Sequence, residues 1–511
     1  MLIEHPRIYL DASGAHTDAI LVRDDTVVAV GDHARQGATS ADDVVRPDAT
    51  CLFPAPGDAH IHLWGLGLRA GTVDLRGLDA EEALHTLADA TPREDGWIFA
   101  TNLDEHQFQR GQQMTRRDLD RLFPDQPVRI HRVDRHAIWV NSTTLKRAGI
   151  EDSFQPGDGG HVERDESGRP TGLLVDAAMK PVLDIIPETT IAEDRATLLD
   201  SAKLLREQGV AFCTIARCPV EHVEMLETLA DERALPLHVD ALVAGTDDAF
   251  ETWRQRGPIE RKDAALRIGG VKFYADGALG SAGAHLLEPY RQGATGLKMH
   301  PEGFLERRIP QLMNDGWQVA VHAIGDAAAR EVLDAFERVP EAVRAALRPR
   351  LEHAQMVAPE DTDRFSKLNV IASIQPIHLR SDAPWAPELL HEEQLERLFP
   401  WRSLMPATVA AGSDYPIDDL NPWHGIATAL TRRGADGKPF RIGDRLHRSE
   451  IIAAYTERAA FASHRESELG ALHPEFRAEI IALDTDPFVA DPDEIWDTNA
   501  HFVTTCVGNT V

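Results

Sequence analysis

The chain begins and ends with short apolar runs that alternate with turn residues, a pattern typical of β-strands. The first fifty residues contain RIYLDASG, AILVRDD and TVVAVGD, and the last forty contain AEIIALDTDP and HFVTTCVGN. The strands near the C-terminus have no local partner, so we expect the two ends of the chain to combine. The pattern predicts a discontinuous β-sandwich domain formed by residues 1–57 and 466–511.

From about residue 200 onward, apolar runs of β type end in polar residues and are followed by helix-like stretches. In DAAAREVLDAFERVP, one helical face would carry Val332, Leu333, Phe336 and Val339, and Pro340 follows. Repeated β-then-α units predict a parallel sheet, either closed as a barrel or left open. The pattern alone does not choose between these two forms.

Residues 96–185 break this rhythm, because they are rich in charged residues, Gly and Pro. The segment GDGGHVERDESGRPTG predicts a loop that carries a hairpin. We therefore expect residues 58–465 to form the central barrel domain, with an insertion at about 96–185 beside its active site.

The composition excludes several classes of protein. A chain of 511 residues with 43% hydrophobic residues is long enough for a large core and an accessory domain. Its 83 acidic residues outnumber 53 basic ones, and the net charge of -30 repels phosphate backbones and anionic lipids. The sequence contains neither a signal-peptide pattern nor a run of about 20 apolar residues. We expect a cytoplasmic protein that binds neither nucleic acid nor membranes.

Side chains of metal-ligand type recur where the expected strands end. In GDAHIHLWG, His60 and His62 are two residues apart, so on a strand both imidazoles would point to the same side. With 23 His in 511 residues, chance supplies about one such pair, which makes the pair weak evidence alone. His322 ends WQVAVH, His353 ends PRLEH and Asp414 ends ATVAAGSD. In a barrel these strand ends meet on one face, where catalytic residues lie.

Lys272, within IGGVKFYADG, is a sixth candidate. An ammonium group cannot bind a cation, and a structural lysine in an ion pair is the usual case. A lysine carbamylated by CO2 becomes a carboxylate, however, and could bridge two metal ions. Asp326, in HAIGDAA, directly precedes an expected helix, so we interpret it as a helix N-cap rather than a catalytic acid.

The ordered motifs of the chain resemble those of the amidohydrolase 3 family of the amidohydrolase superfamily, whose members include N-substituted formamide deformylase-like enzymes. The resemblance covers nearly the whole chain. It is carried, in family order, by FPAPGDAHIHLWGLG, GWIFATNLDEHQF, RVDRHAIWVNS, GRPTGLLVDAAM, GGVKFYADGALGSAGA, VAVHAIGDAA, RLEHAQMV, SIQPIHLRSDAPW, GSDYPI and AAYTERAAFAS. It implies an α/β fold, a (β/α)8 barrel with a β-sandwich from both termini and an insertion after the first barrel strand.

The resemblance also implies roles for individual residues. The implied metal ligands are His60, His62, Lys272 as a carboxylated bridging lysine, His322, His353 and Asp414, with Asp414 also the catalytic proton shuttle. The residues implied near the substrate are His136, Asn141, Gln375 and His378. For these four, a structural role in hydrogen bonding is an equal alternative.

Three positions within the expected barrel domain depart from the family pattern. Where many relatives carry a His-Asp pair, this chain has Ile215 and Ala216, and Ala282 replaces the Arg that usually follows GALGS. These changes could alter substrate specificity.

The expected activity is hydrolysis of a non-peptide C–N bond, amide- or formamide-like, in a small-molecule substrate. One or two divalent ions, with Zn2+ the expected metal, would activate the attacking water. Two alternatives stay open. One is a metal-dependent isomerase, lyase or deaminase on the same scaffold, and the other is a catalytically silent relative with a regulatory role. A homodimer is the default expectation for an enzyme of this size.

Overall fold

The computed structural model describes residues 1–64, 72–93, 95–103, 105, 108, 114–132, 137–156, 160–187, 190–261 and 265–504. The chain divides into two compact units, of which the first contains Met1–Leu63 and Leu198–Val511 and the second contains Trp64–Thr197. The first unit contains a barrel sheet and a sheet formed by the two ends of the chain, and the second unit contains a third sheet. Each unit has its own hydrophobic core.

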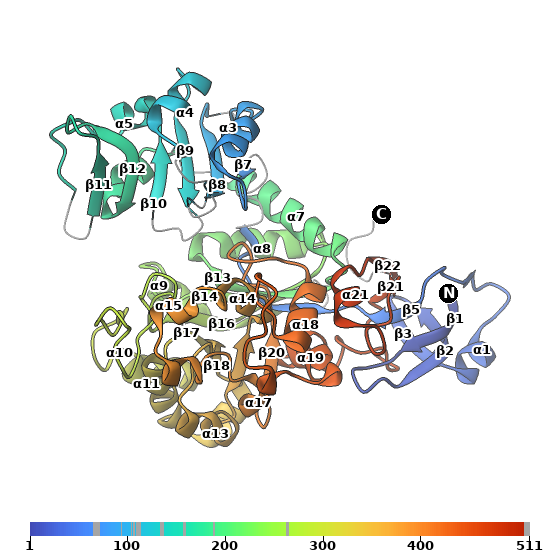
Figure 1. The fold of residues 1–511 in the computed structure, drawn as a ribbon. Coiled ribbons are helices and arrows are strands. Elements are labelled where there is room, and N and C mark those ends of the chain that lie inside the picture. The colour runs from blue at the N-terminus through green and yellow to red at the C-terminus, as the bar shows by residue number, and fades with distance from the viewer. Residues whose placement is uncertain are drawn as a thin grey trace. The chain divides into compact units, whose positions relative to one another are not determined.

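The centre of the first unit is a sheet of eight parallel strands, which are hydrogen-bonded in chain order (Figure 1). They are β6 (Gly57–Ile61), β13 (Phe212–Cys218), β14 (His238–Ala244), β16 (Leu266–Tyr274), β17 (Gln318–Ala323), β18 (Arg350–His353), β19 (Ile371–Ile374) and β20 (Val409–Ala411). A short strand, β15 (Ile259–Arg261), pairs antiparallel with β16. The predicted parallel sheet is confirmed.

Backbone hydrogen bonds join the two edges of this sheet into a barrel. Asp414 N donates to His60 O at 2.8 Å, and His62 N donates to Tyr415 O at 3.0 Å. Gly412 makes this approach possible, because a Cβ on it would lie 2.4 Å from His60 N. The choice between an open and a closed sheet is thus settled in favour of the barrel.

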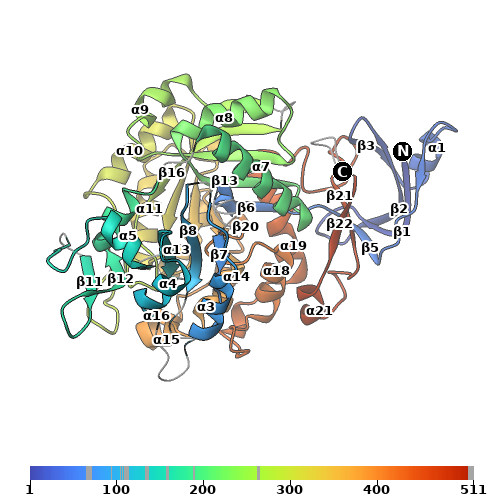
Figure 2. The ribbon, with the colours of Figure 1, turned by 90° about the horizontal axis from the view of Figure 1, so that it is seen from above.

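Helices lie around the outside of the barrel strands (Figures 1 and 2). The longer ones are α7 (Ile191–Glu207), α8 (Val220–Asp231), α10 (Phe304–Asn314), α11 (Asp326–Glu337), α12 (Glu341–Leu347), α13 (Pro359–Lys367), α14 (Pro376–Asp382), α18 (Pro422–Thr431), α19 (Arg448–Tyr455) and α20 (Glu457–Ala462). Short helical turns are α9 (Phe250–Trp253), α15 (Ala386–Leu389), α16 (Glu392–Leu395) and α17 (Trp401–Leu404). The predicted face of α11 is confirmed, since Val332, Leu333 and Phe336 are buried.

Strands from the two ends of the chain, which were expected to combine in a β-sandwich, form one seven-stranded sheet at the side of the first unit. Its order is β22-β21-β5-β1-β2-β3, and β4 pairs with β1. The strands are β1 (Leu2–Tyr9), β2 (His16–Arg23), β3 (Thr26–Val30), β4 (Val44–Val45), β5 (Cys51–Pro54), β21 (Ile480–Leu483) and β22 (Ala500–Thr504), and the helices beside them are α1 (Asp32–Gly37) and α21 (Pro492–Trp496). Leu52 of β5 and Ile480 of β21 share one core. β5 leads directly into the first barrel strand.

The second unit contains a six-stranded sheet in the order β11-β12-β10-β9-β8-β7. Its elements are β7 (Thr72–Asp74), α3 (Ala80–Ala88), β8 (Ile98–Leu103), α4 (Arg116–Leu122), β9 (Val128–Arg132), β10 (Ala137–Val140), α5 (Ser142–Arg147), β11 (Gly160–Arg164), β12 (Pro170–Asp176) and α6 (Lys180–Leu183). The antiparallel pair β11 and β12 is the predicted hairpin.

The second unit is longer than the insertion predicted at residues 96–185, which is a correction to its bounds. The unit begins earlier because β7 pairs with β8, and because Ala83 and Leu87 of α3 pack into its core. The sequence did not indicate that these elements belong to the second unit, because they are short and resemble the segments that flank a barrel strand.

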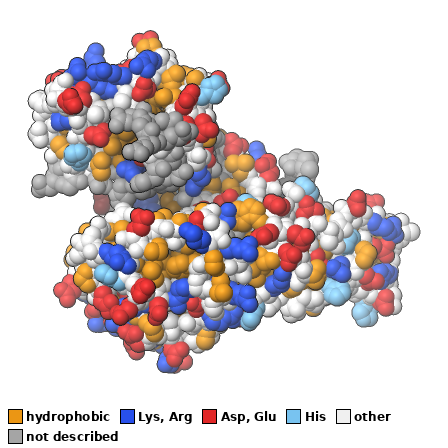
Figure 3. Space-filling model, viewed as in Figure 1, with side chains coloured by type: hydrophobic (Ala, Val, Ile, Leu, Met, Phe, Trp, Pro, Cys, Tyr) orange, Lys and Arg blue, Asp and Glu red, His pale blue; other side chains and the backbone are white. Residues whose placement is uncertain are grey.

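The surface carries both signs of charge. Figure 3 shows Lys and Arg side chains interspersed with Asp and Glu over the face in view. Among the residues that the structure describes, no helix has the length and apolar character needed to cross a bilayer.

Candidate metal centre

All six predicted metal-site residues lie toward the C-terminal ends of barrel strands. His60 and His62 are at the end of β6, and Asp414 follows β20. The remaining three lie on the next strands around the barrel: Lys272 on β16, His322 on β17 and His353 on β18. The face of the barrel that carries catalytic residues in this fold therefore carries these side chains here.

Asp414 is at the centre of a first group of ligand atoms. Its Oδ1 lies 3.4 Å from His60 Nε2 and 3.2 Å from His62 Nε2. Two donors bound to one tetrahedral zinc at about 2.0–2.1 Å are about 3.3 Å apart. The two measured separations thus match those between ligands of one ion, and the ligand atoms of all three side chains lie within 4.8 Å of one another.

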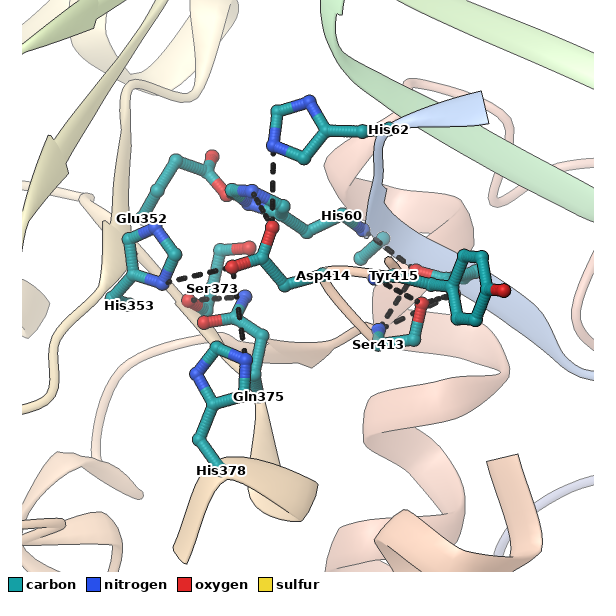
Figure 4. Close-up of polar contacts among 12 residues, drawn as sticks. His60, His62, Glu352, His353, Ser373, Gln375, His378, Ser413, Asp414 and Tyr415 are labelled. Carbon is teal, nitrogen blue, oxygen red and sulfur yellow. Dashed lines mark hydrogen bonds and ion pairs between the residues drawn. The ribbon is translucent and has the colours of Figure 1, made fainter. Parts of the chain in front are cut away.

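The second oxygen of Asp414 belongs to a second group (Figure 4). Oδ2 lies 3.9 Å from His353 Nδ1 and 3.7 Å from His378 Nε2. The ligand atoms of His353, His378 and Asp414 all lie within 4.8 Å of one another. One carboxylate therefore turns one oxygen toward each group.

Buried polar atoms without a partner are concentrated at this place. Among the described residues, no hydrogen bond is made by His60 Nε2, Lys272 Nζ, His353 Nδ1, Gln375 Oε1, His378 Nε2 or Asp414 Oδ1. Burying a polar atom without a hydrogen bond costs free energy, so such a cluster indicates a ligand that binds there. Imidazole nitrogens and a carboxylate are the donors that zinc and similar ions prefer. The donor set fits a divalent cation.

His60 is held by an ion pair that the sequence analysis missed. Its Nδ1 lies 2.5 Å from Glu352 Oε2, and Arg350 Nε donates to Glu352 Oε1 at 2.7 Å. All three side chains are fully buried. This contact leaves Nε2 as the nitrogen of His60 that can bind a metal. The sequence did indicate a buried ion pair here, because Arg350 and Glu352 are two residues apart on an apolar strand and buried charges need a partner.

Two further buried carboxylates were also missed. Asp58 accepts from His60 N at 3.0 Å and from Ser413 N at 3.1 Å, so it ties β6 to the segment that bears Asp414. Asp276 accepts from Gly325 N at 2.8 Å. Burial raises the pKa of Asp58 to about 6 and that of Asp276 to about 7.

His322 lies beside the two groups but outside both of them. Its ring centroid is 4.4 Å from that of His353. Its Nε2 lies 3.5 Å from Asp276 Oδ1 and 3.5 Å from Gly277 O. That nitrogen therefore faces the loop after β16.

The electrostatics differ among these side chains. Burial by itself would lower the pKa of His60, but Glu352 and Asp414 raise it above its usual value. Burial lowers the pKa of His62, and it lowers that of His322 to about 3, with Lys272 adding to the second shift. Burial by itself would raise the pKa of Asp414, but His60 and His62 hold it well below its usual range. The imidazoles of His62 and His322 are thus neutral and the carboxylate is ionised.

Lys272 has a fully buried ammonium group beside these ligands, with 1% of the residue exposed. Burial lowers its pKa to about 8. Its Nζ lies 5.1 Å from the ring centroid of Tyr274.

Two residues of these groups also have backbone conformations that side chains disfavour. His353 has a φ of 77° and Asp414 a φ of 55°, both in the left-handed region. Such strain persists where surrounding structure imposes it, and it is common at functional sites.

The residues implied near the substrate separate into three cases. Gln375, the N-cap residue of α14, and His378, on its first turn, belong to the centre. Asn141 lies in the second unit, where its side chain accepts from Thr144 N and donates to Phe123 O, which describes a structural role there. His136 falls outside the described residues.

Asp326 does not cap α11, which corrects its interpretation as an N-cap. It is the first residue of α11, and its carboxylate accepts from Leu287 N and from Arg397, each at 2.8 Å. It thus holds the loop after β16. Of the three departures from the family pattern, Ile215 and Ala216 are fully buried in β13, and Ala282 lies in that same loop.

Comparison with known proteins identifies the family. A family model described as "Amidohydrolase family" matches residues 51–511. The chain belongs to the amidohydrolase family. It is 30% identical to YtcJ, a candidate amidohydrolase of Bacillus subtilis, over 94% of this chain and 93% of that protein. It is 27% identical to an N-substituted formamide deformylase of Arthrobacter pascens, over 94% of this chain and 92% of that enzyme.

A solved structure supports the same assignment. The chain is similar to a metal-dependent hydrolase from Pyrococcus furiosus, with a TM-score of 0.79 and 27% identity over 95% of this chain and 99% of that one. The predicted family and barrel are confirmed. This amidohydrolase-family protein is a metal-dependent hydrolase whose His and Asp groups suit a divalent ion.

Proposed function

We propose that this amidohydrolase hydrolyses a non-peptide C–N bond, amide- or formamide-like, with Zn2+ at its centre. The observation that carries the proposal is the ionised Asp414 carboxylate, whose two oxygens each face a group of imidazole nitrogens. The similarity to an N-substituted formamide deformylase supports the choice of bond.

The residues of the centre have different roles in the proposed reaction. His60, His62 and Asp414 would hold a divalent ion, which would supply an attacking water of lowered pKa and polarise a carbonyl group. Glu352 and Arg350 hold His60 in place. Asp414 accepts a proton from the attacking water and then delivers it to the departing nitrogen, so that the C–N bond breaks as an N–H bond forms.

Lys272 is proposed to be carbamylated, which would turn a buried cation into a metal ligand. Its Nζ is buried without a hydrogen-bond partner in the described part of the chain. The amine in its neutral form attacks CO2, an N–C bond forms, and one proton is released to solvent. Intact-protein mass spectrometry under CO2, with Lys272→Met as the control, would detect the modification.

Product analysis tests the proposed reaction. The protein is stripped with a chelator, reloaded with Zn2+ and incubated with an N-substituted formamide and with the matching acetamide. We expect formate or acetate together with the free amine, and only from the loaded protein. Equal turnover by the stripped protein would contradict the proposal, as would an isomerised or eliminated product.

A further inference from the structure

We propose that Arg217 binds a carboxylate of the substrate, at a point remote from the bond that is cut, so that the enzyme selects amides with an anionic substituent. The inference rests on the proposed hydrolysis and names its class of substrate. It starts from the two positions where the His-Asp pair of the family pattern is missing. Ile215 and Ala216 are fully buried and uncharged, and the residue that follows them, Arg217, is the charged residue of β13.

Arg217 lies at the face of the barrel that carries the metal centre. It is next to Cys218, which ends β13 and pairs with Val243 of β14. The residue after Val243, Ala244, pairs with Lys272 of β16. The strand register therefore places Arg217 at about the level of Lys272, two strands away around the barrel.

The Arg217 guanidinium is oriented by one ion pair, which leaves most of its donors available. Nη2 donates to Asp247 Oδ1 at 3.1 Å, and Asp247 Oδ2 in turn accepts from Val220 N at 3.2 Å. Within the described residues this is the one hydrogen bond of the Arg217 side chain, which is 40% exposed. A guanidinium presents five N–H donors in a planar fork that matches a carboxylate. An oriented fork with free donors is suited to bind one through two hydrogen bonds.

Tyr274 connects this guanidinium to the metal centre. Its ring centroid lies 5.2 Å from that of His322 and 5.1 Å from Lys272 Nζ. Burial raises the pKa of Tyr274, and the positive charge of Arg217 opposes that rise, so the guanidinium acts on the phenol from nearby. A substrate whose C–N bond lies at the centre would extend past Tyr274 to bring its substituent to Arg217.

The local balance of charge favours a carboxylate over a phosphate. The chain has a net charge of -30, so an anion has to be recognised by a local cation such as Arg217. Asp247 already offsets part of that positive charge. A phosphate carries nearly two negative charges at neutral pH and would be repelled by Asp247 more strongly than a carboxylate, which carries one.

Matched substrates test the proposal on the full-length protein loaded with Zn2+. One series consists of N-formyl ω-amino acids of increasing length, and the other of N-formyl alkylamines of the same lengths. Hydrogen bonds to charged groups predict a kcat/KM about 10–100-fold higher for at least one carboxylate than for its neutral partner. Arg217→Met should lose this preference and keep its kcat/KM on the neutral series. Arg217→Lys, which keeps the charge without the fork, should retain part of the preference.

Arg256→Met is the matched control. The side chain of Arg256 is 44% exposed, close to the value for Arg217, and it pairs with Glu227 at 3.0 Å. It lies between α9 and β15, on the segment that leads to the start of β16. This variant should hydrolyse both series as the wild type does.

Binding to the chelator-stripped protein separates this proposal from the proposed reaction. Calorimetry measures the affinity for both series without turnover, and N-formyl ω-aminophosphonates of the same lengths are added. We expect the best carboxylate to bind about 10-fold more tightly than its neutral partner, and Arg217→Met to lose the difference.

The outcomes distinguish the two ideas. Hydrolysis without a preference for carboxylates, or a preference that survives in folded Arg217→Met, would overturn the assignment of Arg217. Tighter binding of the phosphonates would overturn the choice of a carboxylate. No hydrolysis of either series, with the binding preference intact, would contradict the proposed function and support the anion site.

Discussion

The two ends of the barrel both bury charged side chains, but they use them differently. At the N-terminal ends of the strands, Arg267 donates to Asp240 at 2.7 Å and to Gln318 at 3.4 Å. Gln318 Nε2 in turn donates to Arg348 O at 2.8 Å and Ala462 O at 3.0 Å. Each of these three side chains thus has at least one hydrogen-bond partner within the protein.

At the C-terminal ends, the centre leaves ligand atoms of His60, His353, His378 and Asp414 without hydrogen-bond partners in the described chain. Buried charged groups thus contribute to stability at one end of the barrel and are arranged for ligand binding at the other. Substitutions at the N-terminal ends of the strands should therefore lower stability, whereas those at the C-terminal ends should lower activity or metal binding.

The largest effect is expected for Asp414→Asn. The amide cannot take the water's proton, so kcat should fall by about 10³-fold, within the usual range for a lost general acid or base. KM should change much less. Steady-state kinetics in saturating Zn2+ measure both, and a kcat close to that of the wild type would contradict the role of Asp414.

At the other end, Arg267→Met should cost stability instead of activity. The change leaves the buried Asp240 carboxylate without its partner, which typically costs about 3–5 kcal/mol of unfolding free energy. Urea unfolding measures this loss, and kcat per folded molecule should stay unchanged. The double variant with Asp240→Asn should recover part of the stability. An Arg267→Met protein with normal stability but lost turnover would contradict this contrast between the two ends of the barrel.

A smaller effect is expected for Glu352→Gln, which weakens the contact that orients His60. Loss of such an outer partner typically lowers metal affinity by about 10–100-fold. Competition with a fluorescent chelator measures the Zn2+ affinity. An unchanged affinity would show that Glu352 serves only to neutralise Arg350.

The effect that is smallest at neutral pH concerns His464, at the N-terminal end of the barrel. Burial, with Arg267 and Arg348 nearby, lowers the pKa of His464 to about 3. A depressed pKa means that the unfolded chain binds the proton more tightly, so stability is full above about pH 6.5 and falls toward pH 3. His464→Asn, which suits the φ of 60° there, should flatten this dependence of the urea midpoint. An equally steep curve would contradict the assignment.

The sequence predicted the elements whose signal is local. Strand ends with His322, His353 and Asp414 could be located from apolar runs alone, and the helical face of α11 from its period. The role of Glu352 was not predicted, because it depends on a contact with His60, which is 292 residues away in the chain. The sequence placed His378 near the substrate, and only the folded barrel shows that its Nε2 lies 3.7 Å from Asp414 Oδ2. Contacts of this kind depend on strand register and barrel closure, which no local pattern specifies.

Elemental analysis of His62→Ala beside Arg267→Met tests the central claim most directly. The side chain of His62 is 29% exposed, so its loss should spare the fold while removing one of three donors of the first group. We predict that purified His62→Ala contains less metal per chain than the wild type and that folded Arg267→Met contains as much. Unchanged metal in His62→Ala would contradict a metal centre built on Asp414.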